Sequence, residues 1–528
     1  MPSLRTLYPG AYAKRVPHSD PSLRKARRAF FKSVSNNFVV LQLLFLGLFC
    51  YIFGALFQQT NHTHNLTIAF VDYDGGAIGH AVRSAYASLQ GPSFPTLIER
   101  PPSDIPSTPQ LWQTVCKTDY WAALYISPGS SDRLQTALTQ NTTTTPYSNK
   151  DILSYIWNEA LYAPVIDASI SAPITLLSST ARIAYTRNLT TSLLSPSPTA
   201  LSILADPWSL TSLNIQPTSQ GSRAIYNTIV IVLVLIQEFF YLGTINGLYA
   251  QFRLYSRLSP QRIAVVRTAN SLVYTLVGSL CVAGSIYAFR AGWEVEGKQL
   301  GLSWMVLWLF AHGNFLVLDV FTIWVPGGYV PMCLISWVIV NITSVVLPFE
   351  LSPGWYRVGY GLPAHAVYQV LVDVWSRGCN PQLGWALPVL FAWEGVGLGL
   401  SLLGVWRRCH FAVVGEEVRA REERERLDTA VGVHLERMRE REGGVSRVER
   451  VKSEKGLEGD GDGDGDGDGE REDELRNELA DALEKVETRQ RREKRKGSVP
   501  CNFGPSFDLP FQHGNDSDQT LDADAESG

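Results

Sequence analysis

Six apolar stretches constrain this sequence more than any other feature. Each is about 20 residues long, the length that a helix needs to cross a hydrocarbon core about 30 Å thick. Unpaired backbone polar groups are costly in lipid, so a chain of this kind must form helices inside the bilayer. The sequence predicts an α-helical integral membrane protein with six transmembrane helices, at 37–58, 226–247, 269–289, 303–325, 329–348 and 385–407.

Basic residues beside the apolar stretches predict the orientation of the chain. Residues 1–36 are rich in lysine and arginine and contain one acid, Asp20, and the segment 248–268 contains four arginines and no acid. Because basic residues favour the cytoplasmic side, both segments and the tail after 407 are predicted to be cytoplasmic. The long basic segment before the first stretch also argues for an uncleaved anchor rather than a signal peptide.

The segment 59–225 is then extracellular or lumenal, and its sequence predicts an α/β domain between the first and second helices. Residues 66–71 and 120–126 are rich in strand-forming side chains and are followed by turn residues, whereas 151–185 has the spacing of a long helix. We expect Asp72 and Asp74, directly after the first strand, to shape a turn. Two Asn-x-Thr sequons with room for a glycan, at Asn141 and Asn188, agree with this placement.

Two of the seven cysteines, Cys116 and Cys379, fall on the oxidising side of the predicted topology. A disulfide between them would tie the α/β domain to the outer loop 349–384. Two separate buried thiols are the alternative, since the sequence does not show whether the two residues approach each other.

Residues 363–375, in that outer loop, carry apolar side chains every three or four positions. They predict an amphipathic helix at the outer membrane interface or, equally, a helix packed against the α/β domain. The tail, 408–528, is charged and of low complexity, with a charged helix over 415–444 and an Asp-Gly run. It is predicted to be largely disordered, with a weak coiled coil around Leu475, Leu479 and Leu483.

The stretch GWEVEGKQ, residues 292–299, has the spacing of a phosphate-binding loop but lacks its final Ser or Thr. It also follows an apolar stretch and carries two acids that would repel phosphate. We interpret it as a turn between helices. Neither a nucleophile elbow nor a metal-ligand pattern occurs, so we expect no enzymatic activity, no cofactor and no metal.

Ionisable side chains inside predicted spans are costly and are candidates for a functional site. The candidates are Glu238, His312, Asp319 and Glu394. They would conduct protons, contact a cationic or polar substrate, or only hydrogen-bond between helices; the sequence leaves these three roles open.

The order of parts resembles a known family. The motifs are VDYDGGAIG from 71, DYWAALYISPG from 119 and SPGWYRVGYGLPAHAV from 352. With the order of the spans, they are similar to the fungal nitrosoguanidine-resistance membrane protein family. Its shared domain of unknown function looks like the six-span permease halves of type-2 ABC exporters, and the likeness covers about residues 30–410.

That resemblance implies residence in the plasma membrane and resistance to toxic small molecules, by export or through lipid organisation. The expected partners are the lipid bilayer and amphipathic small molecules or lipids, with an ATPase subunit in trans at 248–268 or a second copy of the chain. A non-transporting organiser or scaffold that affects lipid asymmetry is the alternative. The balanced charge, 46 Lys and Arg against 50 Asp and Glu, argues against a nucleic-acid partner.

Overall fold

The computed structural model describes residues 21, 24–139, 147–190, 198–218, 228–290 and 294–453. Within these ranges the chain is mostly helical, with one small sheet, and six helices are long and apolar enough to cross a membrane. Each predicted apolar stretch overlaps one of them. These helices are α2 (Arg24–Ala55), α9 (Ile229–Gln251), α11 (Pro260–Ala288), α12 (Gly297–Trp324), α13 (Val330–Val346) and α15 (Leu383–Ser453).

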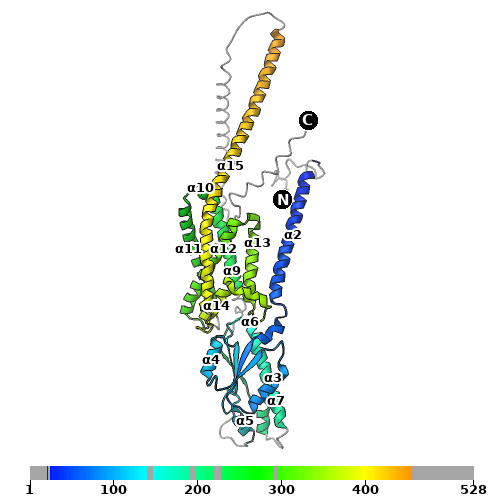
Figure 1. Cartoon of the computed structure of the whole chain (residues 1–528), viewed down its shortest axis with the longest axis vertical. Coiled ribbons are helices and arrows are strands. Elements are labelled where there is room, and N and C mark those ends of the chain that lie inside the picture. Colours follow the sequence, from blue (N-terminus) through cyan, green and yellow to red (C-terminus); the bar gives the residue numbers. More distant parts are fainter. Residues whose placement is uncertain are drawn as a thin grey trace, which may run out of the picture. The chain divides into compact units, whose positions relative to one another are not determined.

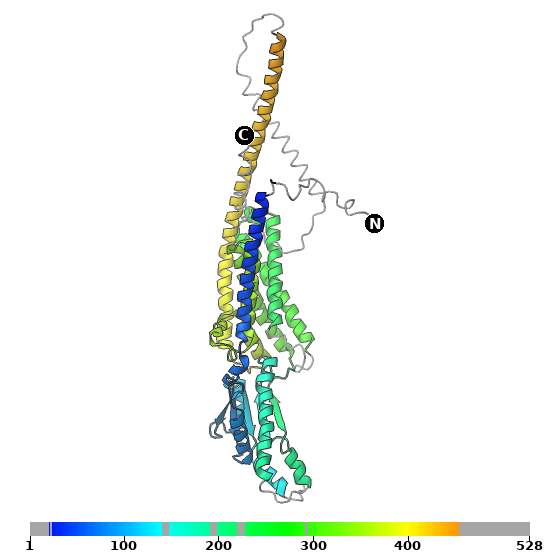
Figure 2. The ribbon, with the colours of Figure 1, turned by 90° about the vertical axis from the view of Figure 1, so that its right-hand side faces the viewer.

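The last of these, α15, continues well past the predicted end of its apolar stretch at 407. It runs as one helix to Ser453 (Figure 2). Its later part includes the predicted charged helix of 415–444, whose Glu and Arg residues are good helix formers and lie in opposite-charge pairs. The Asp-Gly run and the predicted coiled coil lie outside the described residues.

The chain forms two compact units, and their boundaries fall part-way along several membrane helices. The first unit comprises 1–237, 273–314 and 331–396, and it contains the sheet. The second comprises 238–272, 315–330 and 397–528.

The sheet of the first unit has five strands in the order β2-β1-β3-β4-β5. Figure 1 shows the strands of this sheet as arrows between α4 on one side and α3 and α7 on the other. Strand β3 pairs antiparallel with β4, and the other neighbours pair parallel. Strands β1 and β3 cover the two stretches that the sequence predicts as strands. The bounds are β1 (Thr67–Asp72), β2 (Thr96–Arg100), β3 (Ala122–Ile126), β4 (Leu153–Trp157) and β5 (Leu210–Asn214).

Both faces of the sheet are covered, because successive side chains of a strand point to opposite faces. Phe70 and Leu124 belong to a core that includes α3 (Ala77–Leu89), α5 (Ser130–Thr139) and α7 (Ala172–Thr190). Ala69 and Ala123 lie in a second core with α4 (Thr108–Cys116). This arrangement explains why the central strands are buried along their whole length.

The predicted long helix over 151–185 is wrong in its first part, and the residues from Ala163 onward are helical. Residues Leu153–Trp157 form β4, and a short helix α6 (Ala163–Ile166), a π turn η4 (Asp167–Ser171) and then α7 follow. All five β4 residues are buried, and the strand pairs with β3 and β5. A short apolar run buried on both faces has no distinguishing period, so pairing with distant strands decided its conformation.

Helix α14 (Pro363–Trp375) is buried along its whole length except at Val374. It packs against the sheet domain, as the alternative interpretation had it. The Tyr368 hydroxyl accepts a hydrogen bond from the backbone N–H of Tyr162 at 2.9 Å, and the two rings lie 5.0 Å apart, edge to face. Elements far apart in sequence therefore share one core.

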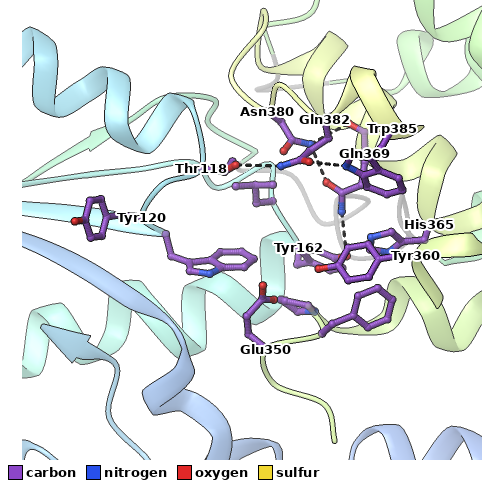
Figure 3. A pocket seen from close by; sticks show the side chains of 14 residues that line it. Thr118, Tyr120, Tyr162, Glu350, Tyr360, His365, Gln369, Asn380, Gln382 and Trp385 are labelled. Atoms are coloured by element: carbon purple, nitrogen blue, oxygen red, sulfur yellow. Dashed lines mark hydrogen bonds between the residues drawn. The ribbon is translucent and has the colours of Figure 1, made fainter. Parts of the chain in front are cut away.

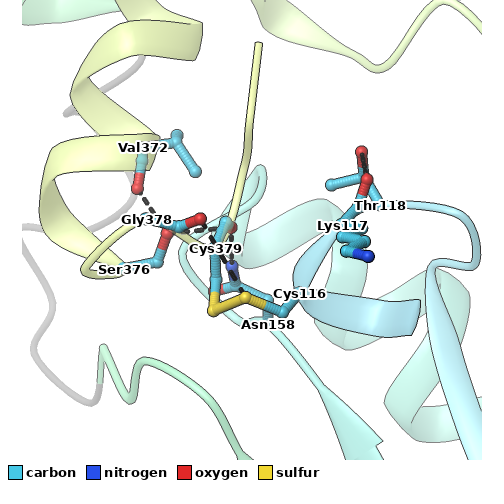
Figure 4. Close-up of a disulfide and its surroundings, with 8 residues drawn as sticks. All are labelled: Cys116, Lys117, Thr118, Asn158, Val372, Ser376, Gly378 and Cys379. Atoms are coloured by element: carbon cyan, nitrogen blue, oxygen red, sulfur yellow. Dashed lines mark hydrogen bonds between the residues drawn. A yellow bond between two sulfur atoms is a disulfide. The ribbon is translucent and has the colours of Figure 1, made fainter. Parts of the chain in front are cut away.

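A disulfide joins Cys116, at the end of α4, to Cys379, in the turn after α14 (Figure 4). That turn closes α14 with Arg377 and Gly378 at positive φ, and the Gly378 N–H donates to the Asp373 carbonyl at 2.8 Å. This 6→1 bond is the Schellman pattern of helix ends. Asn158, directly after β4, donates to the Cys379 carbonyl at 3.0 Å. The sequence left open whether the two cysteines pair, and the structure brings them together beside the end of β4.

We predict that cysteines 116 and 379 are oxidised in the mature protein. The bond closes a loop with a sequence separation of 263, and a disulfide is typically worth about 2–4 kcal/mol, mainly by restricting the unfolded chain. The double variant Cys116→Ser/Cys379→Ser should therefore show a lower thermal midpoint than the parent. Mass spectrometry after differential alkylation should find the pair protected until reduction. Free labelling of both thiols before reduction would contradict the assignment.

Candidate functional site

The four candidate intramembrane residues do not form one cluster. His312 and Glu394 belong to the first unit, whereas Asp319 and Glu238 belong to the second. The surroundings of each residue are therefore defined by the contacts within its own unit.

Asp319, on α12, is the centre of an ion cluster in the second unit. Its side chain is fully buried and lies against two guanidinium groups, Arg267 of α11 at 2.5 Å and Arg408 of α15 at 2.8 Å. The Ser401 hydroxyl donates to its second oxygen at 2.5 Å. One carboxylate therefore connects three membrane helices.

The two arginines have further partners around the carboxylate. Arg267 also donates to Asn246 on α9, at 2.7 Å, and to the hydroxyl of Tyr255 in α10 (Leu254–Arg257), at 3.1 Å. Arg408 donates to Thr322 at 2.5 Å. A desolvated charge is costly in free energy unless it is paired and hydrogen-bonded. Asp319 and the two arginines can therefore be buried only together with this network. Its formal charge is +1, two guanidinium groups against one carboxylate.

The two arginines were not predicted from the sequence as partners of Asp319, because they lie at the ends of predicted spans. There they resemble the basic flanks that set orientation. The structure extends α11 back to Pro260 and α15 past residue 408, which places both side chains inside the helix bundle. The available signal was Asp319 itself, since an acid within a span needs a basic partner.

His312 and Glu394 form a pair in the first unit. His312 Nδ1 lies 2.6 Å from Glu394 Oε1, and the histidine is almost fully buried. The other carboxylate oxygen, Oε2, has no hydrogen-bond partner among the described residues. The pair links α12 to α15 and leaves one acceptor atom unused.

Glu238, on α9, is the most unusual of the four. Its side chain is fully buried, and neither carboxylate oxygen has a hydrogen-bond partner within the described part of the chain. An isolated buried charge costs far more free energy than a paired one. The glutamate is therefore not explained by packing or by a structural ion pair.

A cavity of about 150 Å³ lies in the first unit, between the sheet domain and the segments around α14 (Figure 3). His365 lies at its wall and is almost completely buried. Its Nδ1–H donates to the Ser344 carbonyl at 2.8 Å, and burial lowers the pKa of the imidazole to about 4. His365 is thus neutral at physiological pH.

The acids after β1 have structural roles. Asp72 accepts the N–H groups of Asp74 and Gly75, at 3.1 and 2.8 Å, and pairs with Arg83 at 2.8 Å. Asp74 accepts the N–H of Ser131 at 3.1 Å, at the start of α5. These contacts fit the expected turn.

The phosphate-loop look-alike begins a membrane helix. Gly297 is the first residue of α12, and the Gln299 side chain accepts the N–H of Glu296 at 2.7 Å, as in a capping box. The same amide donates to the carbonyls of Val374 and Trp375, at the end of α14. Gln299 therefore satisfies two helix ends, and Gly292 lies outside the described residues.

Of the two candidate glycosylation sites, Asn188 is exposed near the end of α7. Asn141 lies outside the described residues. Within the ranges that the structure describes, no three His, Cys, Asp or Glu side chains are grouped to hold a metal ion.

Comparison with known proteins finds a matching family model and a related membrane protein. A family model described as a protein of unknown function (DUF3533) matches residues 37–399. An uncharacterized endoplasmic reticulum membrane protein of Saccharomyces cerevisiae is 23% identical over 422 residues, which cover 69% of this chain and 78% of the yeast protein. Neither description specifies an activity.

We predict that Asp319→Asn destabilises the protein by about 3–5 kcal/mol, because it leaves two buried arginines without their counter-ion. The thermal midpoint and yield of the purified chain in detergent would measure this. Glu416→Gln is the matched control, since this carboxylate is less buried and accepts a hydrogen bond from the Ser256 hydroxyl at 2.7 Å. The triple variant Asp319→Leu/Arg267→Met/Arg408→Met should recover most of the loss. If Asp319→Asn were as stable as the parent, the role of the ion cluster in stability would be contradicted.

We also predict a loss of stability as the pH falls from about 6.5 to about 4. The folded-state pKa of His365 is lowered to about 4, while the unfolded chain takes up this proton near 6.5. Below 6.5 the unfolded state binds more protons, so the contribution present above that pH, roughly 3 kcal/mol, is lost on acidification. His365→Gln should flatten the dependence of the thermal midpoint on pH in this window. An equally steep profile in the variant would assign the effect to other groups.

Proposed function

We propose, since the chain belongs to the DUF3533 family of proteins of unknown function, that it is a permease-like membrane protein that exports toxic amphipathic small molecules or lipids. The proposal assigns it no enzymatic activity and no ATPase of its own. It places the sheet domain outside the membrane and both ends of the chain in the cytoplasm, as the basic flanks favour.

The observation that carries this proposal is the unpartnered carboxylate of Glu238. Its burial in a membrane helix without a hydrogen bond from a described residue costs free energy that packing does not return. Sites that handle a cation or a proton retain such groups despite their cost. The free oxygen of Glu394, beside its partner His312, is a second place of the same kind.

The energy source has two candidates. An ATPase in trans would dock on the segment 248–268, where Arg253 and Arg257 are exposed around α10. A proton gradient would instead act through the buried glutamates. The resemblance to nitrosoguanidine-resistance proteins favours export at the plasma membrane. The yeast relative's name points instead to the endoplasmic reticulum for that protein.

A non-transporting membrane organiser is the second candidate function. It is favoured by α15, whose residues from Arg419 to Thr429 are exposed and mostly charged. Such a helix offers a surface to a partner. In this case the membrane helices would anchor a scaffold rather than form a pathway.

We predict that Glu238→Gln lowers the initial rate of efflux of a lipophilic cationic dye by roughly tenfold, equivalent to about 1.4 kcal/mol. Survival on nitrosoguanidine should fall with it, in cells that express only the variant. Glu394→Gln should act in the same direction, because it removes the carboxylate beside His312. Surface abundance is measured in parallel, so that loss of protein is not taken for loss of transport.

Glu296→Gln is the matched control, since this exposed carboxylate pairs with Arg377, at 3.3 Å, outside the spans. Normal efflux in both buried-site variants would remove these groups from the mechanism. If removal of 419–528, which takes away the exposed charged surface of α15, then abolished resistance, the organiser function would be supported. This truncation retains the contact between Ser256 and Glu416.

A further inference from the structure

The cavity of about 150 Å³ in the first unit is built from segments far apart in the sequence. The turn after α4 and the turn after β4 supply one side. The segment after α13, helix α14 and the start of α15 supply the other (Figure 3). A hydrophobic cavity of about this volume holds a molecule the size of benzene, so the space fits a small ligand rather than one water.

Aromatic rings form most of the wall on the side of α14. Phe349 and Tyr360 lie 4.7 Å apart, Tyr360 and Trp385 5.6 Å apart, and the His365 ring stacks on Trp385 at 5.6 Å. Tyr162 and Trp121 line the cavity from the sheet domain. Aromatic rings therefore lie on both sides of the space.

The amide side chains at the cavity are occupied with one another. Asn380 donates to Gln369 Oε1 at 2.8 Å, and Gln382 donates to the Thr118 hydroxyl at 3.2 Å. Trp385 Nε1 in turn donates to Gln382 Oε1 at 2.6 Å. These bonds are drawn in Figure 3. The amides hold the walls together and leave little capacity for a ligand.

Glu350 differs from the other polar side chains at the cavity. Its carboxylate is half-buried, and it accepts no hydrogen bond from another residue among those that the structure describes. In Figure 3 the carboxylate points into the space, toward Tyr162. Arg357 acts on it through its charge but is exposed and does not line the cavity. The described lining residues include no lysine or arginine, and His365 is neutral at physiological pH, so the site has one acidic side chain and no cationic one.

We propose that this cavity binds a small organic cation of the quaternary ammonium type. Ring faces attract a bulky cation that cannot donate hydrogen bonds, and Glu350 supplies the opposite charge. The ligand is either a free molecule or the head group of a choline lipid, which share this chemistry. The binding of the cation does not depend on the proposed function. The interpretation of this cation as an exported substrate does rest on it.

The walls are held by backbone and covalent constraints. Thr118 and Tyr162 both have positive φ, 61° and 52°, which is unfavourable for residues with a Cβ atom. The Cys116–Cys379 disulfide lies two residues before Thr118 and directly before Asn380 in the chain, and both of these residues line the cavity. A site held in this way is preorganised for its ligand.

The test measures binding to the purified full-length chain in nanodiscs of phosphatidylglycerol, with tetramethylammonium and choline as probes. Calorimetry and saturation-transfer NMR should detect both cations. The neutral isostere 3,3-dimethylbutan-1-ol, which has the shape of choline without its charge, should bind about tenfold more weakly or not at all. Equal binding of the isostere would overturn the proposal.

Two variants locate the site. Glu350→Gln and Tyr360→Leu should each weaken cation binding by about tenfold. Tyr360 is partly exposed, so its replacement is expected to be tolerated if Glu350→Gln folds poorly. Glu296→Gln, an exposed acid away from the cavity, is the control and should bind as the parent does. Unchanged binding in both cavity variants, at a normal thermal midpoint, would overturn the assignment.

Two further arms identify the source of the cation. If the occupant is a lipid, phosphatidylcholine should co-purify with the parent and be lost in Glu350→Gln, and phosphatidylcholine nanodiscs should block tetramethylammonium. If the ligand is free, binding should be the same in both lipids. Absence of cation binding and of retained phosphatidylcholine would overturn the proposal. If no cation bound, export that depends on Glu238 would still be supported. If export failed, cation binding that persists in Glu238→Gln would still support the assignment of the cavity.

Discussion

A charge buried in a helix bundle must be matched where it lies, and the second unit is organised around this constraint. Asp319 has no exposed surface, yet it carries a carboxylate that two guanidinium groups and a hydroxyl surround. These partners come from α11 and α15, so the registers of three helices are fixed relative to one another. A shift of one helix by a single turn, about 5.4 Å, would leave an unpaired charge inside the bundle. Most apolar contacts tolerate such shifts better, because they are not directional.

The first unit depends on a different kind of connection. The disulfide, the Tyr162–Tyr368 contact and the bond from Asn158 to the Cys379 carbonyl join the sheet domain to the segment after α13. Because α14 is buried on nearly every side, that segment is part of a core. The cavity with Glu350 results from this union, since its walls come from both partners. His365, kept neutral by burial, contributes a ring and no charge to it.

Much of the fold could be predicted from sequence where a pattern is local. Apolar length indicated six spanning helices, and strand-forming residues before turns indicated β1 and β3. The prediction failed at Leu153–Trp157, where a short apolar run suits a strand or a helix and pairing with β3 and β5 decides. It also failed to find Arg267 and Arg408 as partners of Asp319, because arginines at span ends resemble orientation signals. Glu350 was not predicted as a ligand-facing acid, since nothing near it in sequence shows what it faces.

The sequence by itself determined that the chain is a membrane protein with a small α/β domain, because hydropathy, strand propensity and turn chemistry act over a few neighbouring residues. It also identified Glu238, His312, Asp319 and Glu394 as costly groups within spans. Only the tertiary structure decided which of them are paired, Asp319 with two arginines and His312 with Glu394. It also decided that Glu238 has no hydrogen-bond partner among the residues that the structure describes. Pairing depends on distances between residues that are tens to hundreds of positions apart, and these distances are set by how the helices and strands pack.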